Sequence, residues 1–211
     1  MRVFGICVAA LALATSAFAQ RFEAYGDYSY LRYNPTITGL NTRSLSGGGG
    51  GLQVNFWKFL GLKADLQGYM STETTVNVTS PISTSQGIIP VGTYKSNSTM
   101  FSYLFGPVVR IPAGRVRPFG ELLFGGVHTN LYGQLSSNLI VGGQSNVSAS
   151  AQHPFAMAFG GGLDVAVNKH FAIRLAEVDW MLTRFTNIWT NTNNQNNFRY
   201  LGGAVFTFGG Q

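Results

Sequence analysis

Eight segments of this sequence alternate apolar and polar side chains with a period of two. This period is typical of β-strands whose two faces meet different surroundings, because successive side chains of a strand point to opposite faces. The cleanest segment, residues 60–71, reads LGLKADLQGYMS, with leucine and alanine on one face and lysine, aspartate and glutamine on the other. The predicted strands are residues 21–32, 52–56, 60–71, 101–111, 117–127, 155–167, 171–182 and 198–208. A glycine run, Gly47–Gly51, precedes the second strand and is expected to permit sharp curvature or close packing of inner side chains.

The connections between these segments are alternately short and long. Residues 57–59, 112–114 and 168–170 are predicted short turns, and the long polar connections are residues 34–46, 72–97, 129–153 and 187–197. This alternation is typical of bacterial outer-membrane barrels, which have an even number of strands, short periplasmic turns and long extracellular loops. The sequence therefore predicts an all-β fold, an eight-stranded antiparallel up-and-down transmembrane β-barrel with both termini on the periplasmic side.

The low charge of the chain supports a membrane location. Charged residues make up 10% of the sequence, against about 25% in a typical soluble domain. No stretch after Ala19 approaches the roughly 18 continuous apolar residues of a transmembrane helix, which leaves the barrel as the spanning structure. The net charge of +6 does not indicate nucleic-acid binding, because the 14 basic residues are scattered singly and no recognition helix carries them.

The first 19 residues are predicted to be a cleaved signal peptide. Arg2 gives a positive start, residues 3–14 are almost wholly apolar, and Ala17 and Ala19 are the small residues that a signal peptidase requires. Export by the general secretory route would leave residues 20–211 as one barrel domain. The single cysteine, Cys7, lies in the removed segment, so we expect no disulfide, zinc cluster or cysteine nucleophile in the mature chain.

Two irregularities interrupt the alternation, and both are interpreted as β-bulges. Pro107 lies within a predicted strand, although a paired strand needs the N–H group that proline lacks. In the seventh segment the apolar residues change from odd to even positions, so one extra residue near Ala176-Glu177 would restore a single lipid face.

Ionisable residues on the polar faces of the strands are the candidate functional residues. They are Glu23, Asp27, Lys63, Asp65, Arg110, Glu121, Asp164, Arg174 and Asp179. Side chains fill the interior of an eight-stranded barrel, and an unpaired charge there would be very costly. We therefore expect a mutually neutralising network that plugs the barrel, in preference to an ion pathway. No catalytic, cofactor-binding or metal-binding set is predicted.

Several strings resemble the small outer-membrane barrels grouped with the transmembrane domain of outer-membrane protein A (OmpA-like). They are residues 25–32 (YGDYSYLR), 105–107 (FGP), 117–119 (RPF), 160–164 (GGGLD) and 203–208 (GAVFTF). The last string resembles the terminal signal read by the barrel-assembly machinery, with Gly203, Phe206 and Phe208 as its marker residues. It departs from that pattern by ending in Gly209-Gly210-Gln211. The resemblance implies an outer-membrane location, contact with outer-membrane lipid and lipopolysaccharide, and a monomeric barrel.

The resemblance implies a structural or surface-interaction role through the long extracellular loops. A small porin-like diffusion channel is the alternative. Some barrels of this size are lipid A deacylases with a His-x-Ser pair, but His128 is followed by Thr-Asn and His153 by Pro-Phe, so an enzyme is not expected. A soluble lipocalin-like binder would need the opposite arrangement, with the apolar face inside and the polar face outside.

Overall fold

The structure is a computed structural model, and it describes residues 21–34, 42–84, 87–111, 113–130, 140–141, 144–145, 153–185 and 194–209. Within these ranges no helix is long and apolar enough to cross a membrane.

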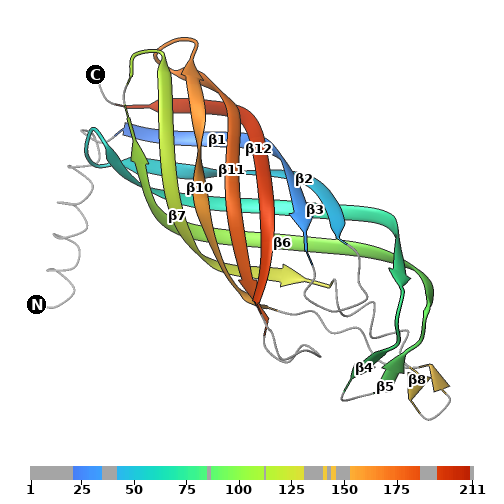
Figure 1. Cartoon of the computed structure of the whole chain (residues 1–211). Coiled ribbons are helices and arrows are strands. Elements are labelled where there is room, and N and C mark those ends of the chain that lie inside the picture. Colours follow the sequence, from blue (N-terminus) through green and yellow to red (C-terminus); the bar gives the residue numbers. More distant parts are fainter. Residues whose placement is uncertain are drawn as a thin grey trace, which may run out of the picture.

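Eight antiparallel strands form a closed barrel in the order β1-β12-β11-β10-β7-β6-β3-β2 (Figure 1). They are β1 (Arg21–Tyr33), β2 (Arg43–Asn55), β3 (Leu60–Val78), β6 (Gly92–Arg110), β7 (Val116–Thr129), β10 (Phe155–Ala166), β11 (Phe171–Arg184) and β12 (Asn194–Phe208). The first and last strands close the barrel, with Phe22 opposite Phe208. The predicted up-and-down barrel is therefore confirmed. The start of β1 and the end of β12 lie at the same end of the barrel as the short connections, here called the turn end, and the opposite end is called the loop end.

The strands reach further toward the loop end than the sequence predicted. β3 and β6 each contain 19 residues and stay paired from Leu60–Val109 to Val78–Gly92, with one register shift between Ser71 and Thr74. A second sheet, in the order β4-β5-β8-β9, contains β4 (Ile82–Thr84), β5 (Gly87–Ile89), β8 (Ile140–Val141) and β9 (Gln144–Ser145). Figure 1 shows β4, β5 and β8 beyond the barrel, away from the C-terminus. The interpretation of these segments as irregular loops was wrong, because threonine, valine and isoleucine in them favour strands.

The glycine run lies inside β2, which begins at Arg43 and not at the end of the predicted loop 34–46. Each glycine pairs with both β1 and β3. A Cβ atom on Gly51 would lie 2.7 Å from Cζ of the Tyr25 ring, and one on Gly49 would lie 2.6 Å from Oε1 of Gln67. The run therefore leaves room for inward side chains of neighbouring strands, as expected from the sequence.

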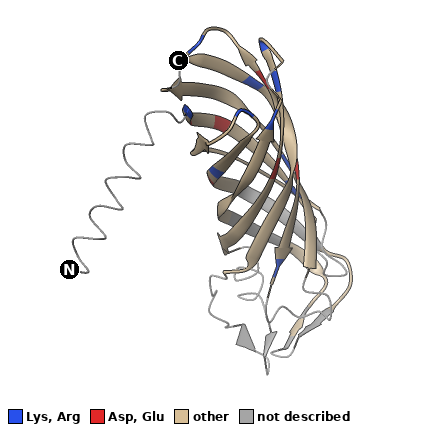
Figure 2. Ribbon diagram, turned by 90° about the vertical axis from the view of Figure 1, so that its left-hand side faces the viewer, with Lys and Arg blue, Asp and Glu red and all other residues tan. Residues whose placement is uncertain are grey.

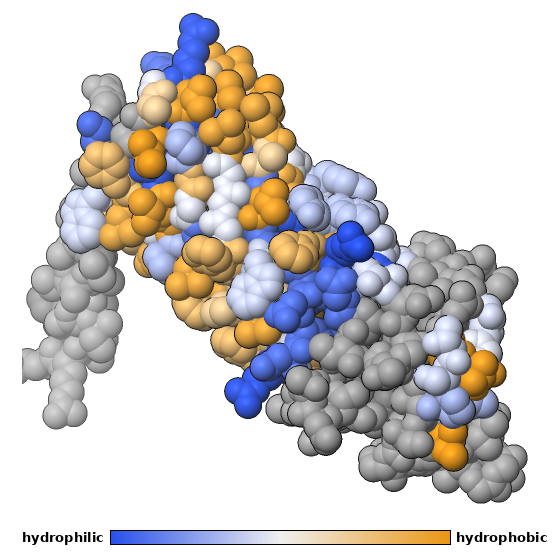
Figure 3. Space-filling model, viewed as in Figure 1, coloured by the Kyte–Doolittle hydropathy of each residue, from blue (hydrophilic) through white to orange (hydrophobic). Residues whose placement is uncertain are grey.

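The apolar face of the barrel points outward and the charged face points inward. Leu62, Leu66 and Phe159 are between 45% and 61% exposed, whereas Lys63, Asp65 and Gln67 are almost fully buried. Figure 3 shows hydrophobic residues over the barrel wall and hydrophilic residues where the wall approaches the loop end. This is the reverse of a lipocalin, in which the interior would be apolar, so the soluble alternative does not fit the fold.

The predicted bulge in the seventh barrel strand is present, and the predicted bulge at Pro107 is not. The register of β11 shifts between Arg174 and Glu177, where Leu175 and Ala176 are both exposed. The pairing of β6 with β7 omits Gly106 and Pro107 but keeps one register on both sides. Proline is accommodated because the ladder is interrupted locally, without an inserted residue.

A group of buried apolar side chains, here called the loop-end cluster, fills the interior toward the loop end. Its members are Leu31, Tyr33, Leu45, Tyr69, Val78, Met100, Leu104, Leu123, Val127, Ala156, Ala158, Met181 and Phe185. A smaller apolar group toward the turn end contains Tyr25, Ala172 and Val205.

Candidate functional site

The alternation of inward and outward residues places most of the acidic side chains of this chain inside the barrel. All seven Asp and Glu residues whose side chains the structure describes point inward, and Figure 2 shows acidic and basic positions on the same barrel strands. Six of these acids and four bases form ion pairs, here called the interior network. Its members are Glu23, Lys63, Asp65, Arg110, Glu121, Asp164, Arg174, Glu177, Asp179 and Arg199.

Arg199 of β12 and Lys63 of β3 are the bases in the first half of the network, and neither is more than 2% exposed. Nη2 of Arg199 lies 2.6 Å from Oδ2 of Asp179, and Nη1 donates a hydrogen bond to Asp65. Nζ of Lys63 donates to Oε2 of Glu121 at 2.8 Å and to Oε1 of Glu177 at 3.0 Å. Each buried base therefore contacts carboxylates from at least two strands.

Arg110 of β6 and Arg174 of β11 form the second half. Nη1 of Arg110 lies 2.6 Å from Oε1 of Glu23, and its Nη2 lies 3.0 Å from Oδ2 of Asp164. Arg174 contacts Asp164 through Nε at 2.9 Å and Glu177 through Nη1 at 2.6 Å. Glu177 therefore joins the two halves of the network, because it also accepts the hydrogen bond from Nζ of Lys63.

Aromatic rings and an amide surround these charges. The hydroxyl of Tyr25 donates to Oδ1 of Asp65 at 2.8 Å, and its ring lies 4.9 Å from Nζ of Lys63 and 4.7 Å from the guanidinium of Arg174. The ring of Phe119 lies 4.6 Å from the same guanidinium. Such cation–π contacts add to the stabilisation of desolvated cations.

The structure brings eight of the nine candidate residues into ion pairs and leaves Asp27 at the edge of the network. Asp27 accepts a hydrogen bond of 2.8 Å from Nε2 of Gln67, which also donates to Asp65. The sequence analysis missed Glu177 because it fell on the predicted bulge. It also missed Arg199, although the alternation of Phe198 and Tyr200 around this residue already indicated an inward position.

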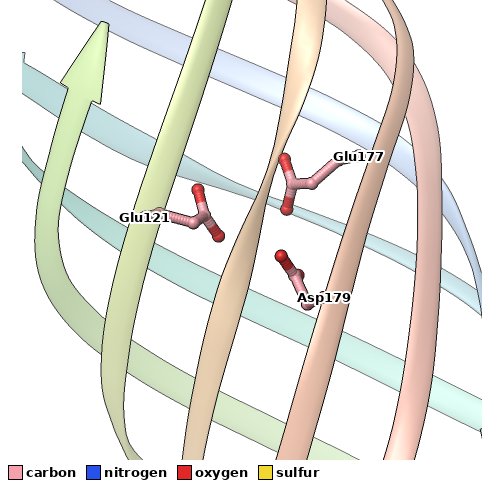
Figure 4. A group of neighbouring side chains, drawn as sticks. All are labelled: Glu121, Glu177 and Asp179. Carbon is pink, nitrogen blue, oxygen red and sulfur yellow. The ribbon is translucent and has the colours of Figure 1, made fainter.

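Three carboxylates of the network lie close enough together to raise the question of a metal ion. Ligand atoms of Glu121, Glu177 and Asp179 are within 4.8 Å of one another (Figure 4). Nη2 of Arg199 lies 3.8 Å, 3.7 Å and 2.6 Å from these residues in that order, and Lys63 contacts the two glutamates. Arg199 and Lys63 therefore supply the positive charge that these three carboxylates need. We interpret the three carboxylates as part of the interior network and not as a metal site.

The remaining predicted residues lie on β12 or outside the part of the chain that the structure describes. Phe206 and Phe208 point outward from β12 and contact the rings of Phe171 and Phe22, at centroid distances of 5.3 Å and 6.4 Å. Gly203 of the same strand pairs with Asp27. The predicted cleavage residues Ala17 and Ala19 lie outside the described residues.

His128 and His153, weighed above for catalysis, lie outside the interior network. They contact each other at the loop end, with a distance of 3.3 Å between their Nδ1 atoms.

Solved structures of similar fold are small outer-membrane barrels. OprG from Pseudomonas aeruginosa matches with a TM-score of 0.56 and 11% identity, over 91% of this chain and 97% of that one. Neisserial surface protein A (NspA) matches with a TM-score of 0.53 and 10% identity, over 89% and 97%. Ail, the attachment invasion locus protein of Yersinia pestis, matches with a TM-score of 0.50 and 14% identity, over 89% and 98%. At these identities the likeness shows the fold alone.

The family comparison covers nearly the whole chain. No curated protein matches the sequence. The family model described as "Outer membrane protein beta-barrel domain" matches residues 5–208. Together with the closed barrel and its outward apolar face, this match shows that the chain belongs to the outer-membrane β-barrel family and is an outer-membrane protein of the Gram-negative type.

Proposed function

We propose that this protein is a closed, non-catalytic barrel with a role at the cell surface, where it presents an extended β-hairpin and binds lipopolysaccharide through its outer wall. The observation that carries this proposal is the filled interior. An enzyme or a channel would need a reactive group or a water path, whereas here the inward charges pair with one another.

Two layers of side chains close the interior. The members of the interior network have exposures of 7% or less, and those of the loop-end cluster have exposures of 3% or less. An eight-stranded barrel is just wide enough for its side chains to fill. A solute entering from the loop end would have to displace the apolar cluster first and then separate buried ion pairs. This supports a plugged barrel over the diffusion channel.

The strands that extend past the barrel wall support a role at the surface. A transmembrane strand needs about 9–11 residues, so the 19 residues of β3 and of β6 extend well beyond the bilayer. The hairpin that they form stays paired as far as Val78 and Gly92. A paired hairpin with a second small sheet offers a more ordered surface to a partner than irregular loops would.

A basic hollow on the outer wall favours an anionic partner. Arg32, Asn34, Phe198 and Tyr200 line a hollow of about 350 Å³ near the loop end. An exposed guanidinium beside aromatic rings suits a phosphate group at the membrane interface, because arginine binds phosphate with two parallel hydrogen bonds. Ail, a barrel of similar fold, has been solved in complex with the heparin analogue sucrose octasulfate. We therefore infer that the phosphates of lipopolysaccharide are the ligand of this hollow.

The test compares Arg32→Gln with Arg115→Gln, a matched loss of an exposed arginine at the turn end. Each protein is placed in vesicles with and without lipopolysaccharide, and its thermal midpoint is followed by the heat-dependent shift in gel mobility. Lipopolysaccharide should raise the midpoint of the wild type and of Arg115→Gln, because a ligand that binds only the folded state stabilises it. The rise should be clearly smaller for Arg32→Gln. Equal rises in all three proteins, or none, would overturn the assignment.

We also propose that the barrel is a monomer and that the barrel-assembly machinery reads β12 through Gly203, Phe206 and Phe208. The outward position of the two rings near the C-terminal end of β12 supports this reading. Phe208→Ala should slow insertion in an assembly assay more than Phe198→Ala, which removes an outward ring at the other end of the same strand. Equal rates would contradict it.

A further inference from the structure

We propose that His128 and His153 form a zinc-binding site at the loop end of the barrel. The site is separate from the interior network and from the hollow around Arg32. Histidine is a common zinc ligand, and two imidazoles fixed on neighbouring strands provide half of a tetrahedral coordination shell.

The backbone holds the two histidines opposite each other. β7 and β10 are paired with Phe155 opposite Gly126, and the N–H of Val127 donates to the carbonyl of Pro154 at 3.0 Å. One further step in this register places His153 directly opposite His128. Residues opposite each other in an antiparallel pair have Cβ atoms about 4.5–5.5 Å apart on one face, so both rings are positioned before any ion binds.

Asn130 and Thr129 fix the end of β7 on its other side. The N–H of Thr99 donates to Oδ1 of Asn130 at 2.8 Å, and the hydroxyl of Thr129 donates to the carbonyl of Thr99 at 3.1 Å. His128 is therefore part of a strand end that is hydrogen-bonded to both neighbouring segments. A site built on fixed backbone loses little conformational entropy when the ion binds.

The distance between the ring nitrogens fits zinc. The Nδ1 atoms are 3.3 Å apart, and the ring centroids are 4.5 Å apart. Two nitrogens at about 2.0–2.1 Å from a tetrahedral ion are separated by about 3.3–3.4 Å, whereas adjacent ligands of a square-planar ion would be only about 2.9 Å apart. A direct hydrogen bond from an N–H group usually has a donor–acceptor distance of about 2.9–3.0 Å. The observed separation therefore matches the spacing of two ligands on a tetrahedral zinc ion, and the titration below separates such a site from a hydrogen-bonded pair.

The two imidazole rings are accessible to solvent. Both histidines are exposed, so water can supply the two remaining ligands. Bound zinc would tie the end of β7 to the start of β10 and so clamp the two ends of the chain segment between the histidines.

Zinc binding to the mature protein without a polyhistidine tag tests the proposal. Zn²⁺ is titrated calorimetrically into the folded barrel in detergent, with Mg²⁺ as the hard-cation control. His128→Gln and His153→Gln are compared with His170→Gln, which removes the remaining histidine, at the turn end. One zinc per monomer should bind to the wild type and to His170→Gln. Either of the other variants should lose at least about 100-fold in affinity, because the second ligand acts at high effective concentration.

Chemical modification of the wild-type protein gives a second test that does not depend on whether the histidine variants fold. Diethyl pyrocarbonate modifies free imidazoles, and mass spectrometry locates the products. Zinc should protect His128 and His153 together while leaving the modification of His170 unchanged. Zinc binding that survives both substitutions, or a stoichiometry of half a zinc per monomer, would overturn the proposal. So would equal protection of His170, or a histidine pair that binds no zinc and forms only a hydrogen bond.

Discussion

Replacing Arg199 with methionine should destabilise the barrel strongly. Arg199 is fully buried and pairs with Asp179 at 2.6 Å and with Asp65, both also fully buried. Methionine keeps much of the volume but leaves two desolvated carboxylates without their main partner. Removing one member of a buried ion pair costs about 3–5 kcal/mol, because an uncompensated charge stays inside. The free energy of unfolding should therefore fall by about that amount.

The assay is equilibrium unfolding in urea with the barrel in lipid vesicles, followed by tryptophan fluorescence. The control is Arg184→Met on the exposed face of β11, which should change the free energy of unfolding by no more than about 0.5 kcal/mol. Adding Asp65→Asn and Asp179→Asn to Arg199→Met should restore much of the lost stability, since no charge is then left unpaired there. A loss below about 1 kcal/mol for Arg199→Met, or further destabilisation by the two asparagines, would refute the reasoning.

Two deletions and two substitutions test other parts of the barrel. Deleting Ala176 should preserve the heat-modifiable barrel because it removes the bulge, whereas deleting Met181 should abolish it because the rest of the strand would change faces. Gly51→Val should prevent folding, measured by the same mobility shift, because its Cβ would overlap the Tyr25 ring; a folded variant would contradict the packing. Leu66→Arg should cost about 2–4 kcal/mol in urea unfolding if lipid covers this face, and no loss would contradict the lipid contact.

Period-two alternation was sufficient to predict the barrel because each strand separates lipid from a polar interior. The segment at 60–71 shows why, since Leu62 and Leu66 point outward whereas Lys63, Asp65 and Gln67 are buried inside. The bulge in β11 could be located to within a residue for the same reason. Glu177 was nevertheless missed, because a bulge hides which of its neighbours points inward.

Elements in which apolar and polar side chains do not alternate could not be predicted from the sequence. Gly47–Gly51 has no side chains to alternate, so the start of β2 was placed too late. The outer halves of β3 and β6 extend past the bilayer, where threonine and serine are tolerated on either face. Pairing partners such as Arg199 with Asp65 depend on the barrel register, which brings together residues 134 positions apart. Sequence indicated inward charges there, but not which charges would meet.

Conductance of the purified protein in planar bilayers tests the filled interior most directly. Among the residues that the structure describes, the interior network and the loop-end cluster fill the barrel with side chains that are at most 7% exposed. Inserted wild-type barrels should therefore show no steady current steps across the membrane at moderate voltage. Large, long-lived and uniform channels would contradict the plugged barrel and favour the diffusion channel.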